Sequence, residues 1–156
     1  MSETTLRSAQ EDDRATIMKI MESANMHYIP SLEMPELDLS CFFVAEISGT
    51  IVGAAGYRIL SPTTAKTTLM AVLPEYKGKG IGNLLQTRRM EELYQRGIKK
   101  LTTNADLPET ISWYQKHFGY RPVGKLPKQH EFGNPNLSEW TTLEVNLEDW
   151  KHGKYR

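Results

Sequence analysis

The stretch LMAVLPEYKGKGIGNLL, from Leu69 to Leu85, constrains the fold of this chain more than any other. It begins as an apolar run, and glycine then occupies every second position from Gly78 to Gly82, just before a segment with helical periodicity. Glycines at the amino end of a helix let an anion approach the backbone N–H groups without a Cβ in the way. Lys77 and Lys79 add positive charge. The stretch therefore predicts a strand, an anion-binding turn and a helix, in that order.

Two common phosphate-binding loops do not fit this turn. A P-loop requires G-x-x-x-x-G-K-[ST], but the Gly-Lys pair of this turn is followed by Gly80. The dinucleotide fingerprint G-x-G-x-x-G, counted from Gly78, ends at Asn83 instead of glycine. Lys99 and Lys100 lie in the region where that fingerprint also needs an acidic residue. Both alternatives fail on the residues themselves.

Hydrophobic periodicity around the turn predicts an α/β protein of the mixed α+β type. Strands are expected at residues 4–7, 41–47, 51–59, 67–73, 98–103, 121–125 and 140–147, with Ser48-Gly49 as a two-residue hairpin. The order β-α-βββ-α-β-α-β-β contains hairpins and two helical crossovers, so the sheet should be mixed. Residues 25–40 fit either a short helix or an irregular lid, because prolines interrupt the pattern.

Capping residues indicate where the three helices begin and end. Ser8 with Glu11 forms a capping-box pattern, and Asp106 is placed to cap the third helix. Gly97 and Gly119 are placed to end the second and third helices in the left-handed conformation. The apolar positions expected to define the second helix are Ile81, Leu84, Leu85, Leu93 and Tyr94.

Composition narrows the classes of partner. The chain has 156 residues, which predicts a single domain over residues 1–156. With 19 basic and 19 acidic side chains, its formal charge is +0, so nothing in the total favours nucleic acid or a membrane surface. A single cysteine, Cys41, excludes an internal disulfide and fits a cytoplasmic location. The four histidines are scattered without zinc-ligand spacing, so no metal is expected.

Two motifs at the right separation resemble the GCN5-related N-acetyltransferase (GNAT) family. In its motif A, a strand pattern V-x-P leads into [QR]-x-x-G-x-[GA] and a helix, and here Val72-Leu73-Pro74 and the segment 77–82 occupy those places. Downstream, ISWYQKHFGYRPVG from Ile111 to Gly124 is similar to the family's next helix and strand, with Tyr114 at the tyrosine position. The resemblance covers nearly the whole chain, and it implies a central, partly splayed mixed sheet flanked by helices.

The resemblance implies that acetyl-CoA is the cosubstrate. Backbone N–H groups of the glycine turn would hold the pyrophosphate, and the edge of the preceding strand would hold the pantetheine arm. A backbone N–H of that strand would bond the thioester oxygen, where a donor aimed at a developing oxyanion is worth several kcal/mol. The residues that the resemblance assigns to acetyl-CoA are Met70, Ala71, Val72, Lys77, Gly78, Lys79, Gly80, Ile81, Gly82, Asn83 and Asn104.

The implied reaction is direct attack of a substrate amine on the thioester carbonyl. Tyr114 is then the general acid for the departing thiolate, although its position on an apolar helical stripe also fits a core residue. The strand that carries a glutamate base in some relatives has no acid here. The base candidates are Glu46, Glu75, His117, His130 and Glu131, of which His130 and Glu131 lie in the best place, and a water relay would also serve.

Three departures from the family pattern affect individual contacts. Lys77 stands where glutamine or arginine is usual, which keeps positive charge but loses a planar fork. Leu107 occupies the place of an asparagine that many members use for the pantetheine amide, and Asn104 is a shifted substitute. The segment YQKHFGY is one residue longer than the common form.

Neutral charge and the long polar loop at 125–139 favour a small-molecule amine as acceptor. The alternatives are a protein amino terminus or lysine, a non-catalytic acyl-CoA sensor, and a module that binds nucleotides through their phosphates. Exposed edge strands in this fold favour a homodimer.

Overall fold

The structure is a computed structural model that describes residues 3–23, 37–128 and 136–153. Its chain divides into two compact units. Unit 1 consists of Met1–Arg58 and Thr68–Glu91, and unit 2 consists of Ile59–Thr67 and Glu92–Arg156. Three elements, two strands and a helix, contribute residues to both units, so each unit is described by itself below.

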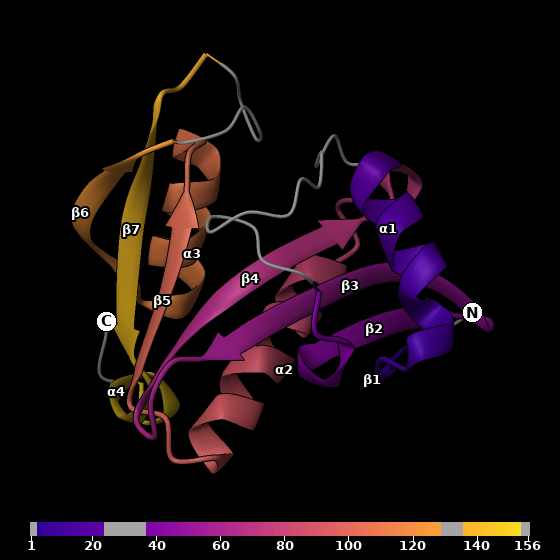
Figure 1. The fold of residues 1–156 in the computed structure, drawn as a ribbon, viewed down its shortest axis with the longest axis horizontal. Helices are drawn as coiled ribbons and strands as arrows, with labels where there is room; N and C mark the ends of the chain where they lie inside the picture. The colour runs from indigo at the N-terminus through magenta and orange to yellow at the C-terminus, as the bar shows by residue number, and fades with distance from the viewer. Residues whose placement is uncertain (1–2, 24–36, 129–135, 154–156) are drawn as a thin grey trace. The chain divides into compact units, whose positions relative to one another are not determined.

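Unit 1 contains the strands β1 (Thr4–Ser8), β2 (Phe42–Ile47), β3 (Thr50–Ile59) and the second part of β4 (Thr64–Val72), in that order across the sheet. The β1–β2 and β2–β3 pairs are antiparallel. Helix α1 (Arg14–Ser23) lies on one face of these strands and α2 (Ile81–Gln95) on the other (Figure 1). Three short 3₁₀ turns complete the unit: η1 (Glu11–Asp13), η2 (Leu39–Cys41) and η3 (Pro74–Tyr76).

The core of unit 1 follows the expected periodicities. On α1, the residues Ile17, Ile20 and Met21 are buried, at the i, i+3, i+4 spacing of one helical face. The β2–β3 hairpin turns at Ser48 and Gly49, whose φ angles of 51° and 79° match the type I′ geometry that favours two-residue hairpins. The hairpin prediction is therefore confirmed.

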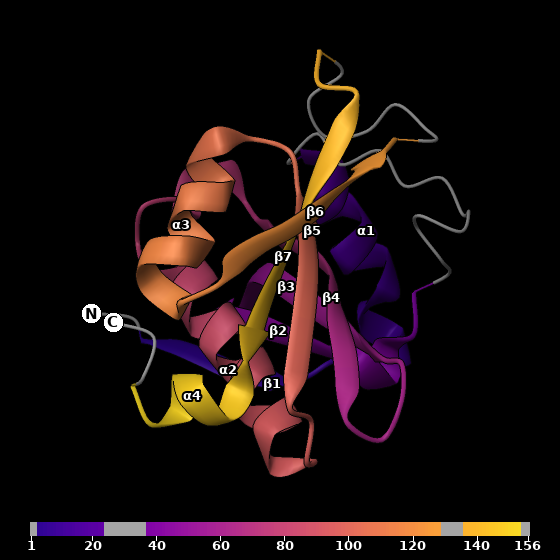
Figure 2. The same ribbon diagram turned by 90° about the vertical axis from the view of Figure 1, so that its left-hand side faces the viewer.

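Unit 2 contains the first part of β4, followed across the sheet by β5 (Lys100–Ala105), β7 (Glu139–Asn146) and β6 (Arg121–Pro127). Thr64–Lys66 of β4 pairs in parallel with Lys100–Thr102 of β5, whereas β7 is antiparallel to both of its neighbours. Figure 2 shows α3 (Pro108–Phe118) beside these strands and α4 (Leu147–Lys151) at the end of β7. The sheet is thus mixed, as predicted.

Strand β6 is an edge strand, since β7 is its one neighbour in the strand order. All seven of its residues are exposed. It carries prolines at positions 122 and 127 and basic residues at 121 and 125. Register shifts between Pro122 and Gly124, so the strand is also irregular.

Several expected element ends are wrong. Ser8 ends β1 and does not cap α1; instead the Asp13 carboxylate accepts a 2.7 Å hydrogen bond from the Gln10 backbone N–H. Asp106 does not cap α3, because Leu107 is the N-cap and Pro108 begins the helix. Leu84 is 43% exposed and does not belong to the buried face of α2. The residues Gly97 and Gly119 are left-handed, as predicted.

Strand β4 begins three residues before the expected position 67, and the short helix α4 was not anticipated. The earlier start of β4 follows from its turn. The Ser61 hydroxyl lies 2.7 Å from that of Thr64, and the Leu60 N–H donates to the Thr64 carbonyl at 2.9 Å. Helix α4 begins where the Asn146 side chain accepts from the Asp149 N–H at 2.9 Å.

Candidate functional site

The turn between β4 and α2 has the backbone conformation that its glycines allow. Gly78 and Gly80 have φ angles of 79° and 80°, in a region that residues with a side chain rarely adopt. A Cβ placed on either glycine would meet no atom within 4 Å. Glycine is therefore needed at these positions for conformation, and the side of the turn where a Cβ would stand is open.

Helix α2 begins directly after this turn, at Ile81. The first N–H groups of a helix have no acceptor within the helix, and the helix dipole gives them partial positive charge. Ile81 is buried and anchors the turn, whereas Lys77 and Lys79 are exposed and no acidic residue stands in the first turn of the helix. These residues fit an anionic group such as the pyrophosphate of CoA.

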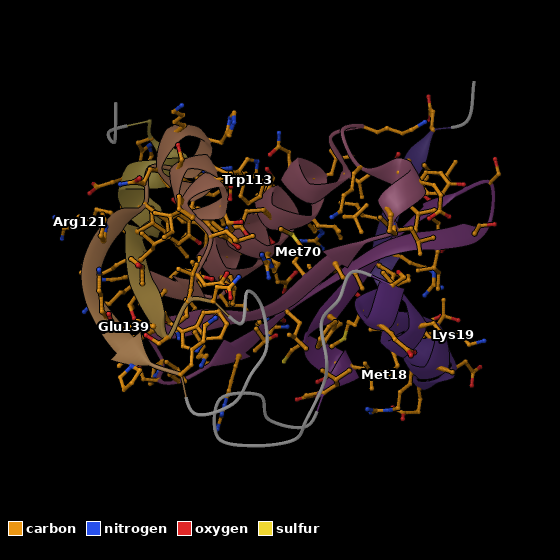
Figure 3. All side chains as sticks on the ribbon, turned by 90° about the horizontal axis from the view of Figure 1, so that it is seen from above. Met18, Lys19, Met70, Trp113, Arg121 and Glu139 are labelled. Carbon is orange, nitrogen blue, oxygen red and sulfur yellow. The ribbon has the colours of Figure 1, made fainter. Side chains whose placement is uncertain are left out.

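Unit 1 also contains the strand residues that the sequence assigned to the pantetheine arm. Met70, Ala71 and Val72 are the last three residues of β4 (Figure 3 labels Met70). The strand is held at its end by the Leu73 N–H, which donates to the Val52 carbonyl of β3 at 2.8 Å. Unit 1 therefore brings together the strand end and the glycine turn that the sequence predicted to hold acetyl-CoA.

Tyr114 belongs to unit 2, where it lies on α3 in an aromatic cluster. Its ring is 4.9 Å from that of Trp113, in an edge-to-face arrangement, and 4.9 Å from that of Tyr120. Phe118 lies 5.0 Å from Trp113 and completes the cluster. The Tyr114 residue is 6% exposed, and its hydroxyl makes no hydrogen bond with any described residue. Packing against Trp113 and Tyr120 fixes the Tyr114 ring.

Asn104 also belongs to unit 2, and the resemblance assigned it to the binding of acetyl-CoA. It is exposed on β5, and its side-chain oxygen accepts a 2.7 Å hydrogen bond from the Thr142 hydroxyl of β7. This oxygen is therefore already engaged, which leaves the amide NH₂ as the group of Asn104 that could reach a ligand. Leu107, at the usual asparagine position, is 37% exposed at the N-cap of α3.

The candidate bases lie in different surroundings. Glu46 forms an ion pair with Arg7. Glu75 is exposed in η3, and His117 is exposed on α3, 6.3 Å from the Trp113 ring. His130 and Glu131 lie outside the described residues.

Sequence reasoning missed two buried charged groups. Arg89 is fully buried on α2 in unit 1, and Lys128 forms a buried ion pair with Asp106 in unit 2. A signal for Arg89 is present, because it stands four residues after Leu85 and four before Leu93 on the buried stripe of the helix. The Lys128–Asp106 pair leaves no such local signal, since the two residues are 22 positions apart.

Within the described ranges, no group of three or more His, Cys, Asp or Glu side chains is placed to hold a metal ion. Nor does this part of the chain include a helix with the length and apolar character needed to cross a membrane.

Comparison with known proteins gives a consistent set of matches. The model of the acetyltransferase (GNAT) family matches residues 10–120. An uncharacterised N-acetyltransferase of Chlorobaculum tepidum is 28% identical over 130 residues, which cover 80% of this chain and 79% of that protein.

Two solved structures share the fold. The ribosomal-protein-S18-alanine N-acetyltransferase of Escherichia coli superposes with a TM-score of 0.74 at 18% identity, covering 93% of this chain and 94% of that one. An acetyltransferase of Salmonella typhimurium, solved with its cofactor acetyl-CoA, gives a TM-score of 0.70 at 21% identity and covers 94% and 95% of the two chains.

Proposed function

The chain belongs to the GNAT family and is therefore an acetyl-CoA-dependent N-acyltransferase, and we propose that it acetylates the primary amine of a small molecule by direct attack in a ternary complex. The family match includes parts of both units, which supports our proposal that residues 1–156 are one domain. A cytoplasmic location is part of the same proposal, supported by the lone Cys41.

The observation that carries the cosubstrate assignment is the open, left-handed turn at Gly78 and Gly80 before α2. In our proposal its N–H groups and the amino end of α2, from Ile81 to Asn83, bind the pyrophosphate. The exposed side chains of Lys77 and Lys79 neutralise part of the phosphate charge.

Acetyl-CoA supplies an activated acetyl group as a thioester. In the proposed mechanism, a backbone N–H among Met70, Ala71 and Val72 donates to the thioester oxygen and stabilises negative charge that develops there. Tyr114 donates its hydroxyl proton to the departing sulfur. An alkylamine has a pKa of about 10, so it must lose a proton before it attacks, and we propose that a water chain to solvent or one of the base candidates accepts that proton.

The preference for a small acceptor rests on the balance of charge. A total of 19 basic and 19 acidic side chains gives no long-range field that would attract a strongly charged macromolecule. A protein amino terminus is the rival acceptor, and the similarity to an enzyme named for the alanine of ribosomal protein S18 is the observation that favours it.

The decisive experiment combines binding with turnover. Calorimetry with CoA tests the glycine turn: we expect binding by the unaltered protein and about a 10-fold loss in Gly80→Val, because a β-branched residue cannot adopt this φ without strain. A protein that binds no CoA would end the proposal.

Tyr114→Phe separates a catalyst from a non-catalytic sensor. In a panel of small amines and amino-terminal peptides, followed by release of free thiol, we expect this variant to lose turnover by about 100-fold or more while keeping its affinity for CoA. Full turnover in the variant would remove Tyr114 from the mechanism, and turnover with peptides alone would replace the small acceptor by a protein one.

A further inference from the structure

Arg89 is a charged side chain in the apolar interior of unit 1. It lies on the face of α2 that also carries Leu85, Met90 and Leu93, and all four are fully buried. No salt bridge joins Arg89 to a carboxylate in the described part of the chain. Its Nε atom is buried without a hydrogen-bond partner in the same region. A buried guanidinium of this kind needs an explanation other than charge pairing.

The guanidinium is directed at the backbone of two neighbouring strands. Its Nη1 atom donates to the Gly56 carbonyl of β3 at 2.9 Å and lies 3.4 Å from the Leu69 carbonyl of β4. Its Nη2 atom donates to the side-chain oxygen of Gln86, one turn earlier on α2, and lies 3.7 Å from the sulfur of Met70. The hydrogen bond to Gln86 thus orients the planar guanidinium of Arg89, so that its Nη1 atom faces the carbonyl groups of the two strands.

Stability alone does not account for this arrangement. Burying a charge without an opposite charge is unfavourable, and replacing buried charges by apolar residues of similar volume is often neutral or stabilising. A leucine at position 89 would extend the apolar stripe of α2 and leave no unpartnered Nε atom. Arginine at position 89 must therefore have a role other than stability, through its contacts with the backbone of β3 and β4.

The Leu69 carbonyl and the Met70 N–H belong to one peptide unit. The described chain has no cis peptide bond, so these two groups point in opposite directions across a planar unit. Nη1 lies 3.4 Å from the Leu69 oxygen, so this oxygen is on the side of the peptide unit that faces the guanidinium, and the Met70 N–H is on the side that faces away from it. A cation at the oxygen end also polarises the peptide, which makes its N–H a stronger donor.

We infer that Arg89 is a positioning residue that aims and polarises the Met70 N–H as the donor to the acetyl thioester oxygen. This inference rests on the proposed function, since it selects one donor among the three strand residues assigned to the thioester arm. Arg89 touches neither substrate. It acts through the Leu69–Met70 peptide, near the labelled Met70 in Figure 3.

The test compares the affinities of acetyl-CoA and CoA, because CoA lacks the carbonyl that the Met70 N–H would bind. We expect calorimetry on the full chain to show that acetyl-CoA binds more tightly than CoA, by about 2- to 10-fold, the range of one net hydrogen bond. In Arg89→Leu this ratio should fall to about 1 with CoA affinity unchanged, whereas Arg89→Lys should keep an intermediate ratio because it retains the charge without the fork.

A matched control is Arg88→Leu. It removes the same charge from the neighbouring position on α2, where the guanidinium stacks 4.5 Å from the Phe43 ring, and it should leave the ratio unchanged. A fall of the ratio in Arg88→Leu as large as in Arg89→Leu would assign the effect to net charge and overturn the inference.

A second measurement needs no variant and covers the case in which Arg89→Leu does not fold. In ¹⁵N spectra of the unaltered protein, the Met70 amide proton should move downfield with acetyl-CoA and stay in place with CoA. Equal shifts with both ligands, or an affinity ratio that survives in Arg89→Leu, would overturn the inference and leave the proposed function standing. Failure to bind either ligand would overturn both.

Discussion

The two units each bury a cation, and they treat it in opposite ways. In unit 2, Lys128 Nζ lies 2.9 Å from Asp106 Oδ2, with the two side chains 6% and 10% exposed, and 4.5 Å from the Trp140 ring centroid. In unit 1, Arg89 is buried completely and has carbonyl, amide and thioether partners. In unit 2 an ion pair ties the start of α3 to the end of β6, whereas in unit 1 a cation that meets no carboxylate in the described ranges contacts the backbone of two strands.

This difference predicts how each unit responds to the loss of its charge. Removing one partner of a buried pair leaves the other charge uncompensated, so the unit 2 cation should be important for stability. Removing Arg89 takes away a charge that has no counter-ion among the described residues, so its loss should affect function more than stability.

The largest expected effect comes from Asp106→Ala. It removes the carboxylate of an ion pair whose side chains are 6% and 10% exposed, and we expect the free energy of unfolding to fall by about 3 kcal/mol. Urea unfolding followed by circular dichroism measures this change. Adding Lys128→Met to the variant should recover most of the loss, and if the double variant is no more stable, the loss comes from packing or from the Asp106 contact with the Leu107 N–H.

A smaller effect is expected from Gly80→Ala, which tests whether the stability of unit 1 depends on the left-handed backbone conformation at Gly80. Alanine at a φ of 80° should lower the free energy of unfolding by about 1 kcal/mol. Gly124→Ala in unit 2 is the matched control, because that glycine has no positive φ and a Cβ there would also meet nothing within 4 Å. Equal losses in the two variants would show that conformation at Gly80 carries no special strain.

A third effect concerns Asp13, whose pKa is held below its ordinary value chiefly by hydrogen bonds from the Arg7 guanidinium. A carboxyl with a depressed folded-state pKa stabilises the protein fully above its unfolded pKa, near 4. It loses that contribution as the pH falls through the folded value. Arg7 is 39% exposed and solvent screens the pair, so the contribution should be about 0.5 kcal/mol.

Asp13→Asn should therefore reduce the drop in unfolding free energy between pH 5 and 2, measured by urea titration at each pH, by about this amount. The Glu11 carboxyl offers the comparison: Arg14 also lowers its pKa, but solvent screens this more exposed pair, so Glu11→Gln should change the profile less than Asp13→Asn does. An identical acid profile for Asp13→Asn and the unaltered protein would contradict the role given to Arg7.

The smallest change in stability is expected for Arg89→Leu. Its free energy of unfolding should stay within about 1 kcal/mol of the unaltered protein, or rise, because the variant removes a buried charge that meets no carboxylate in the part of the chain that the structure describes. Thermal and urea unfolding both measure it. A loss as large as that of Asp106→Ala would erase the distinction between the two buried cations.

The sequence predicted best those features that depend on local conformation. Gly78 and Gly80 were identified as positions where the lack of a Cβ would let an anion approach the backbone, and the structure adds that both have a positive φ. The Ser48-Gly49 hairpin was predicted from its turn residues. The amphipathic stripe of α1 was read correctly because three buried residues share one helical face.

Features that depend on partners distant in sequence were missed. Asp106 has the side chain of a good N-cap, but the Lys128 ammonium group competes for its carboxylate from the far end of β6. The place of Arg89 on the apolar stripe of α2 indicates that it is buried, but no local window shows the Gly56 and Leu69 carbonyls that its guanidinium contacts. The residue types of Asp106 and Arg89 alone gave no reason to expect the Lys128 ammonium group or the two strand carbonyls as their partners.

The composition of β6 has a consequence for how the protein behaves at high concentration. An exposed edge strand is a template on which a second chain can add a strand, and repeated addition leads to aggregation. Pro122 and Pro127 have no N–H to offer such a chain, and the irregular register between Pro122 and Gly124 disrupts the straight edge that it would need. The positive charges of Arg121 and Lys125 repel a second copy of the same strand. This edge therefore disfavours the addition of a strand from a second folded chain.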